Sequence, residues 1–312
     1  MKNAPFFREI AEGPQDVNAY WTKADDNTRI RVVHWPIDGN GDGTIFIFQG
    51  RTENAEKYGR AVQVFHSAGY HAFALDWRGQ GLSDRLSEDH MLGHVTTYLA
   101  YHKDIAAFLN TAEELQLPKP WFLFGHSLGA CVGLQALIDG LPVNASAFTA
   151  PLWDINLPKL QKFAAWPLSW AAQAIGKGKT YAPGTRGESY VLTTNFMENR
   201  LTHDPDMYQY YQNVSKTLVN QQIGGPSMGW LFQTLKETKR LSKITSPETP
   251  CITFCGAEDS IVAIPAVEER MKRWKNGSFE LVPNARHDLL YEVEDIRTPV
   301  FKSILSLFRN TT

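Results

Sequence analysis

The chain has 312 residues, of which 43% are hydrophobic and 21% are charged, and its formal net charge is −2. This composition is typical of a globular protein with a large core, and without a basic block it argues against nucleic-acid binding. No apolar run approaches the roughly 20 residues that span a bilayer, and the start of the chain lacks the apolar core of a secretory signal. The odd number of cysteines (Cys131, Cys251 and Cys255), all in apolar stretches, indicates reduced core thiols and hence a cytoplasmic protein.

Near the N-terminus, runs rich in aromatic and β-branched residues at 18–21 and 29–35 predict an antiparallel hairpin. The next segment, Asp-Gly-Asn-Gly-Asp-Gly at 38–43, matches the first half of a calcium loop. However, the twelfth position, which should carry a bidentate glutamate, is Gln49, and an apolar strand follows where a helix is needed. We therefore interpret this segment as a glycine turn, and we expect no metal.

From residue 44 onward, apolar strands alternate with segments of helical periodicity. This alternation predicts an α/β fold, with a mostly parallel central sheet and helices on both faces. The predicted strands are 44–48, 70–77, 121–124 and 145–150, and the predicted helices are 54–68, 97–115 and 130–137.

The sequence Gly125-His126-Ser127-Leu128-Gly129 stands between a predicted strand and a predicted helix. A nucleophile elbow needs this context, because its serine occupies a sharp, strained turn above the sheet. Gly125 and Gly129 would keep the turn free of side-chain crowding, and the Leu128 amide, at a helix N-terminus, would point toward a developing oxyanion. The alternative is a glycine-rich turn with an idle serine.

A second oxyanion donor usually comes from the loop after an early strand. Here that loop is Gln49-Gly50-Arg51-Thr52-Glu53, and the amide of Arg51 is the candidate, because Gly50 allows the backbone to come close. An ordinary strand-to-helix turn is the alternative. The glycine-rich segment 76–83 holds no nucleophile–base pair, so we interpret it as a structural turn tied by Asp76 and Arg78.

The strand–helix alternation stops between residues 151 and 246, where aromatic residues are dense and helices are predicted at 159–174, 205–218 and 226–241. We interpret this segment as a helical cap, or lid, inserted into an α/β core formed by 1–150 and 247–312. An apolar cap suits an apolar substrate, although most of its aromatic residues are expected to form the cap's own core.

After the insertion, the chain returns to strand and helix, and two polar loops follow two predicted strands. Glu258 and Asp259 follow the strand at 251–255, and His287 follows the edge strand at 278–282. A serine needs a base within hydrogen-bond reach, and the base needs an orienting carboxylate. The chain order serine, acid, histidine is the order of α/β-hydrolases, and it favours Ser127, Asp259 and His287 as a triad.

In these motifs the chain resembles the α/β-hydrolases of the serine aminopeptidase S33 type, the group that contains bacterial lysophospholipase L2 and monoacylglycerol lipase. The resemblance is closer to the lysophospholipase L2 type. It implies Ser127 as nucleophile, Asp259 and His287 as its partners, and the Arg51 and Leu128 amides as the oxyanion hole. Many relatives have His-Gly where this chain has Gln49-Gly50. The motifs that carry the resemblance are Gly50–Glu53, Asp76–Ser83, Leu92–Val95, Gly125–Gly129, Gly224–Trp230, Gly256–Asp259 and His287–Glu292.

The sequence thus predicts a serine ester hydrolase that removes an acyl chain from a lysophospholipid or a monoacylglycerol, without a cofactor. The alternatives are a peptidase of the prolyl aminopeptidase type, a general carboxylesterase and a non-catalytic ligand-binding homologue. Haloalkane dehalogenases and epoxide hydrolases are disfavoured, since they use aspartate where this chain has Ser127. The cap could also rest on the inner face of the membrane, although the sequence shows no clear amphipathic anchor. The oligomeric state does not follow from the sequence.

Overall fold

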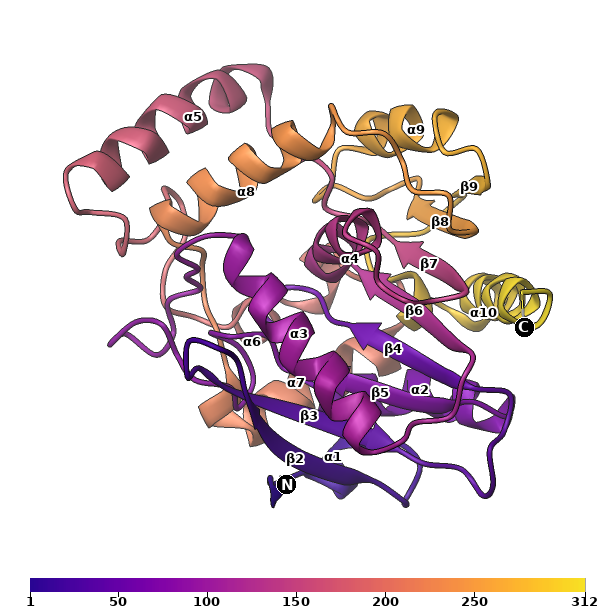
Figure 1. The fold of residues 1–312 in the computed structure, drawn as a ribbon. Helices are drawn as coiled ribbons and strands as arrows, with labels where there is room; N and C mark the ends of the chain where they lie inside the picture. Colours follow the sequence, from indigo (N-terminus) through magenta and orange to yellow (C-terminus); the bar gives the residue numbers. More distant parts are fainter. Residues whose placement is uncertain (312) are drawn as a thin grey trace.

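The computed structural model describes residues 1–311, which are organised around one nine-stranded sheet (Figure 1). The strand order is β1-β2-β3-β5-β4-β6-β7-β8-β9. The first three strands are antiparallel to their neighbours, and the other six are parallel. The strands are β1 (Lys2–Asn3), β2 (Asn18–Lys23), β3 (Arg29–Trp35), β4 (Thr44–Phe48), β5 (His71–Leu75), β6 (Trp121–His126), β7 (Ala145–Thr149), β8 (Cys251–Gly256) and β9 (Gly277–Val282).

Helices cover both faces of this sheet. Phe108, in α3, packs against Phe46 and Phe73 on one face, and Phe65, in α2, packs against Phe301 of α10 on the other. The α-helices are α1 (Arg8–Ala11), α2 (Gly59–Ser67), α3 (Leu99–Glu114), α4 (Leu128–Ile138), α5 (Lys159–Ala174), α6 (Tyr190–Thr193), α7 (Pro205–Thr217), α8 (Met228–Leu241), α9 (Ile264–Lys272) and α10 (Glu294–Arg309). The short 3₁₀ helices are Glu56–Tyr58, Phe196–Glu198, Val219–Gln221 and Leu289–Tyr291.

The predicted fold class is therefore confirmed, including the antiparallel hairpin formed by β2 and β3. The segment 38–43 is a turn that leads directly into β4, and Gly39, Gly41 and Gly43 all have positive φ angles that favour glycine. The helix predicted at 97–115 appears as α3, which begins at Leu99; this first residue is 67% exposed. No helix among residues 1–311 is long and apolar enough to cross a bilayer.

Between β7 and β8 the chain makes a long, largely helical excursion that contains α5, α6, α7 and α8, which we call the insertion. In Figure 1, α5 and α8 lie side by side at the top of the molecule, beyond the sheet. By contrast, α7 is fastened to the core, since the Tyr210 hydroxyl donates to the carbonyls of Ala11 (2.7 Å) and Glu56 (2.8 Å). The insertion is thus part anchored and part projecting.

Candidate active site

Ser127 stands at the junction of β6 and α4, in a backbone conformation that side chains rarely adopt (φ 50°, ψ −113°). The surroundings leave no room for side chains at the neighbouring glycines. A Cβ at Gly129 would lie 1.9 Å from the Phe48 carbonyl oxygen, and one at Gly125 would lie 2.9 Å from the Phe148 ring. The strain is held by the packing of β4 against the first turn of α4. This is the geometry that the G-x-S-x-G motif requires.

Two loops at the carboxyl ends of β8 and β9 bring Asp259 and His287 together. The Nδ1 atom of His287 lies 2.7 Å from Oδ2 of Asp259, and both side chains are buried. The other carboxylate oxygen of Asp259 accepts the amides of Ile261 (2.7 Å) and Val262 (3.1 Å). The carboxylate therefore fixes the imidazole, and Nε2 is left for the cavity that Ser127 and His287 both line.

The electrostatics of this pair favour an imidazole that can take up a proton. Burial lowers the pKa of His287, but the carboxylate of Asp259, with smaller contributions from Asp288 and Glu53, outweighs burial and raises the pKa above its ordinary value. Burial raises the pKa of Asp259, but the charge and hydrogen bond of His287 and the two backbone amides outweigh it and leave the pKa lowered. Asp259 thus stays ionised and stabilises the charged imidazole.

The rival acid, Glu258, points elsewhere. Its Oε2 atom lies 3.2 Å from Nε2 of His203, whose Nδ1 in turn lies 3.0 Å from Glu292. Glu258 is also half exposed, whereas Asp259 is buried. Of the two carboxylates that follow β8, only Asp259 contacts His287.

In the loop after β4, the backbone amide of Arg51 is free while those of its two neighbours are paired. The Gly50 amide donates to Oε2 of Glu53 (2.6 Å), and the Thr52 amide donates to Oε1 of Gln80 (2.8 Å). The Arg51 amide between them has no acceptor among the described residues. The Leu128 amide is equally unpaired, because it belongs to the first turn of α4. The two predicted oxyanion donors are thus the unpaired amides of two tightly held turns.

Arg51, Ser127 and His287 line a cavity of about 1100 Å³ between the sheet and the insertion, slightly larger than the usual range for small-molecule pockets (about 300–1000 Å³). Ser127 and His287 line it on the sheet side. The insertion supplies mostly apolar lining: Ala164, Leu168, Val191, Val214, Leu218, Ile223, Met228 and Trp230.

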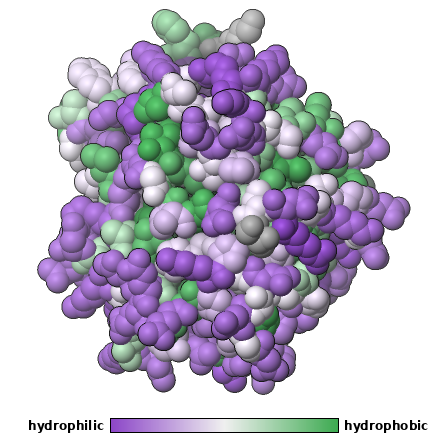
Figure 2. All heavy atoms as spheres, turned by 45° about the vertical axis from the view of Figure 1, so that its right-hand side comes forward, coloured by the Kyte–Doolittle hydropathy of each residue, from purple (hydrophilic) through white to green (hydrophobic). Residues whose placement is uncertain are grey.

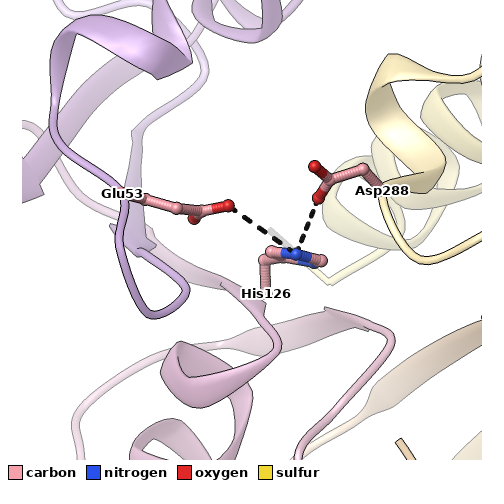
Figure 3. A group of neighbouring side chains, drawn as sticks. All are labelled: Glu53, His126 and Asp288. Atoms are coloured by element: carbon pink, nitrogen blue, oxygen red, sulfur yellow. Dashed lines mark ion pairs between the residues drawn. The ribbon is translucent and has the colours of Figure 1, made fainter. Parts of the chain in front are cut away.

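The cavity is also lined by a buried polar network that we call the loop network: Glu53, Lys57, His126 and Asp288. Figure 3 shows three of these side chains converging, with His126 Nε2 at 2.7 Å from Asp288 and 3.8 Å from Glu53. The Lys57 ammonium pairs with both carboxylates, lying 3.0 Å from Asp288. Each member neighbours a functional group, since Glu53 is on the Arg51 loop, His126 precedes Ser127 and Asp288 follows His287. The network therefore ties together the three loops that carry Arg51, Ser127 and His287.

Two carboxylates and an imidazole form a donor set that could hold a cation. Here the Lys57 ammonium already pairs with both carboxylates, so a positive charge of the protein itself occupies the place that a cation would take. Sequence reasoning missed Glu53, Lys57 and Asp288 as functional candidates. Glu53 and Asp288 stand inside motifs that carried the family resemblance, and these motifs were the signal that could have identified them.

Comparison with known proteins places the chain in a family. The family model described as serine aminopeptidase, S33, matches residues 39–294. Lysophospholipase L2 of Escherichia coli is 26% identical over 97% of this chain and 92% of its own length. Probable lysophospholipase L2 of Haemophilus influenzae is 24% identical over 83% of this chain and 82% of its own.

Solved structures show the same fold. A soluble variant of monoglyceride lipase from Saccharomyces cerevisiae superposes with a TM-score of 0.72 at 18% identity, covering 93% of this chain and 94% of its own. A thermostable carboxyl esterase from Bacillus coagulans superposes with a TM-score of 0.75 at 14% identity, covering 95% and 99%. With a mostly parallel sheet, a strained serine elbow and a family match over most of its length, the chain is a hydrolase of the α/β-hydrolase fold and belongs to the serine aminopeptidase S33 family.

Proposed function

We propose that the protein is a serine hydrolase that cleaves the carboxylic ester of a lysophospholipid or a monoacylglycerol. The observation that carries this proposal is the buried His287–Asp259 pair, because His287 lines the same largely apolar cavity as the strained Ser127. The relatives named lysophospholipase L2 and monoglyceride lipase support a lipid ester as substrate.

In the proposed reaction, the Ser127 hydroxyl attacks the ester carbonyl while Nε2 of His287 takes its proton. Asp259 holds the imidazole in position and stabilises its charged form. The amides of Arg51 and Leu128 stabilise the tetrahedral oxyanion. His287 then gives its proton to the leaving alkoxide, and a water molecule releases the fatty acid from the acyl-serine by the same steps. No cofactor takes part in this proposal.

A peptidase activity is less well supported, because binding a substrate amine needs free carboxylates in the cavity. Of the carboxylates that line it, Glu53 and Asp288 are paired with Lys57, and Glu198 accepts the side-chain amide of Asn195 (2.9 Å). The apolar lining also favours an acyl chain over a peptide backbone, whose polar groups would lose their hydrogen bonds there.

We further propose that residues 151–246 form a cap domain and that its outer face touches a lipid surface. Leu160 and Phe163 on α5 are each 81% exposed, and Trp170 is 57% exposed. On the face visible in Figure 2, apolar residues are more frequent in the upper half, the end at which α5 lies in Figure 1. Leu168 of the same helix lines the cavity, so this helix connects the apolar surface to the active site. The cytoplasmic location stays a prediction.

The lipid contact can be tested by flotation with anionic phospholipid vesicles. Replacing Leu160 and Phe163 by serine should lower the bound fraction, because it removes apolar area that would enter the membrane interface. It should leave turnover of a water-soluble short-chain ester intact. Equal binding by the variant and the parent protein would refute the contact through α5.

The catalytic proposal is tested by fatty-acid release from a lysophospholipid, with Ser127→Ala as the control. The variant should lose at least about a thousandfold in rate, the scale expected for a triad member. If the protein hydrolyses short p-nitrophenyl esters but not the lipid, the serine esterase mechanism would stand and the proposed lipid substrate would be wrong. An unchanged rate in the variant, or no labelling of the parent protein by a fluorophosphonate, would reject the serine mechanism itself.

A further inference from the structure

Arg51 brings an unpaired positive charge to the wall of the active-site cavity. Its side chain lines the cavity, and among residues 1–311 no carboxylate lies within ion-pair distance of its guanidinium. The guanidinium makes one hydrogen bond, from Nη1 to the Gly224 carbonyl (2.9 Å), and its carbon lies 5.4 Å from the centre of the Trp230 ring. A cation held in this way is positioned by the insertion but not neutralised.

The other charged groups of the cavity differ from Arg51. Lys57 is paired twice within the loop network, and its charge is compensated there. Arg200 also lacks a carboxylate partner among the described residues, but its side chain is exposed, so solvent screens its charge. Arg51 is therefore the partly enclosed cation that is left for a ligand.

The Arg51 guanidinium is charged at neutral pH, although burial disfavours its charged form. Burial lowers the pKa of Arg51 to about 10, and the nearby hydroxyls of Tyr101 and Tyr98 offset only part of this effect. A desolvated guanidinium gains more from an anionic partner than an exposed one does. Its planar fork suits the paired oxygens of a phosphate, and the hydrogen bond to Gly224 leaves further N–H groups available.

The position of Arg51 also fits such a partner, because the same residue provides the proposed oxyanion amide. The ester carbonyl oxygen would lie at that amide, so the guanidinium is separated from it by the length of one arginine side chain. In a lysophospholipid, a similar number of covalent bonds separates the ester carbonyl oxygen from the phosphorus atom. A monoacylglycerol has only a neutral hydroxyl at the corresponding place.

We propose that the Arg51 guanidinium binds the phosphate oxygens of the substrate headgroup, so that the site prefers acyl esters of glycerophosphate over acyl esters of glycerol. This inference rests on the proposed lipid-ester hydrolase function and adds the headgroup to it. It gives one residue two roles, in which the backbone binds the carbonyl and the side chain selects the headgroup.

The test compares two substrates with the same acyl chain, 1-oleoyl-lysophosphatidylethanolamine and 1-oleoylglycerol, in the same mixed micelles. The readout is the ratio of their kcat/KM values. Arg51→Gln should lower this ratio at least about tenfold, as expected for loss of a hydrogen bond to a charged group. Arg51→Lys should lose less, because it keeps the charge without the fork. The control Arg200→Gln removes a screened charge from the same cavity and should change the ratio less than about threefold.

Each other outcome has a distinct meaning. If Arg51→Gln lowers both activities equally, Arg51 only fastens the insertion through Gly224 and Trp230, and the inference is overturned. Equal effects of Arg51→Gln and Arg200→Gln on the ratio would overturn it too, in favour of a diffuse positive potential. If the parent protein hydrolyses neither lipid, the proposed function itself fails and the headgroup role falls with it.

A second measurement separates a lipid headgroup from free phosphate. Inorganic phosphate is added to the hydrolysis of p-nitrophenyl butyrate, which has no headgroup. Weak inhibition that is lost in Arg51→Gln, together with the changed lipid ratio, supports the headgroup site. The same inhibition with an unchanged lipid ratio would mean that Arg51 binds free phosphate only, and the headgroup inference would then be wrong.

Discussion

Replacing Lys57 by methionine would remove the ammonium that pairs with two buried carboxylates while keeping most of the side-chain volume. Lys57 contacts both Glu53 and Asp288, and all three side chains are at least nine-tenths buried. Burial raises the pKa of Asp288, but Lys57 and His126 outweigh it and hold the pKa far below the ordinary range. Without Lys57, two enclosed carboxylates would lie close together without the cation that pairs with both of them.

The size of the effect follows from the cost of an uncompensated buried charge. Removing one partner of a buried ion pair costs about 3–5 kcal/mol. With an unfolding entropy of about 2.1 cal/mol/K per residue, 312 residues give about 0.65 kcal/mol/K. The expected fall in Tm at pH 7.5 is therefore about 5–8 °C. Differential scanning calorimetry of Lys57→Met against the parent protein measures it directly.

The pH dependence gives a second, independent check. Because the folded-state pKa of Asp288 is lowered, its stabilising contribution is present above the unfolded pKa and is lost as the pH falls through the folded value. Loss of Lys57 raises that folded pKa, so the deficit in Tm should be largest at high pH and should shrink toward pH 5. The double variant Lys57→Met/Glu53→Gln, which also removes one of the two carboxylates, should recover part of the stability. A deficit below about 1 °C, or one that grows on acidification, would refute the ion-pair reasoning.

Two further outcomes are expected. The acid limb of the pH profile of kcat/KM should lie above pH 6.5, because the pKa of His287 is raised. His287 acts as a base only when it is neutral, so the activity should rise as the pH passes through this raised pKa. An acid limb below pH 6.5 would contradict the electrostatic influence of Asp259. Gln49→Met should raise the stability by about 1–3 kcal/mol, since both side-chain polar atoms of the buried Gln49 lack partners among the described residues; a lowered Tm would show that this amide is satisfied.

The sequence predicted the sheet and its covering helices well, because their signals are local. The strand 121–124 and the helix after it carry continuous apolar and helical patterns, and they appear as β6 and α4. The very short elements β1 and α1 were not predicted, since two to four residues give no periodicity. The helix predicted at 54–68 begins as a 3₁₀ turn at Glu56, which pairs with the buried Arg31.

In the insertion, sequence patterns predicted the helices but not their packing. Its three longer helices, α5, α7 and α8, were predicted with nearly correct bounds, but neither the four-residue α6 nor the direction of the aromatic residues was predicted. Tyr208 and Tyr211 of α7 are buried, whereas Phe163 of α5 is exposed. Each of the two helices carries three aromatic residues, and only the tertiary arrangement decides which of them meet solvent. The loop network could not be predicted for a similar reason. It joins Glu53 to Asp288, which lie far apart in the sequence, and such a contact leaves no local pattern.

The insertion leaves the sheet after β7 and returns to it at β8, and these two strands are hydrogen-bonded neighbours, with Ser146 opposite Cys251 and Thr149 opposite Phe254. Its exit and re-entry points are thus held side by side by the sheet itself. Segments of different length or sequence can be exchanged there without altering the register of either strand. In evolutionary terms, the insertion can change while the strands and loops that hold Ser127, Asp259 and His287 are inherited intact.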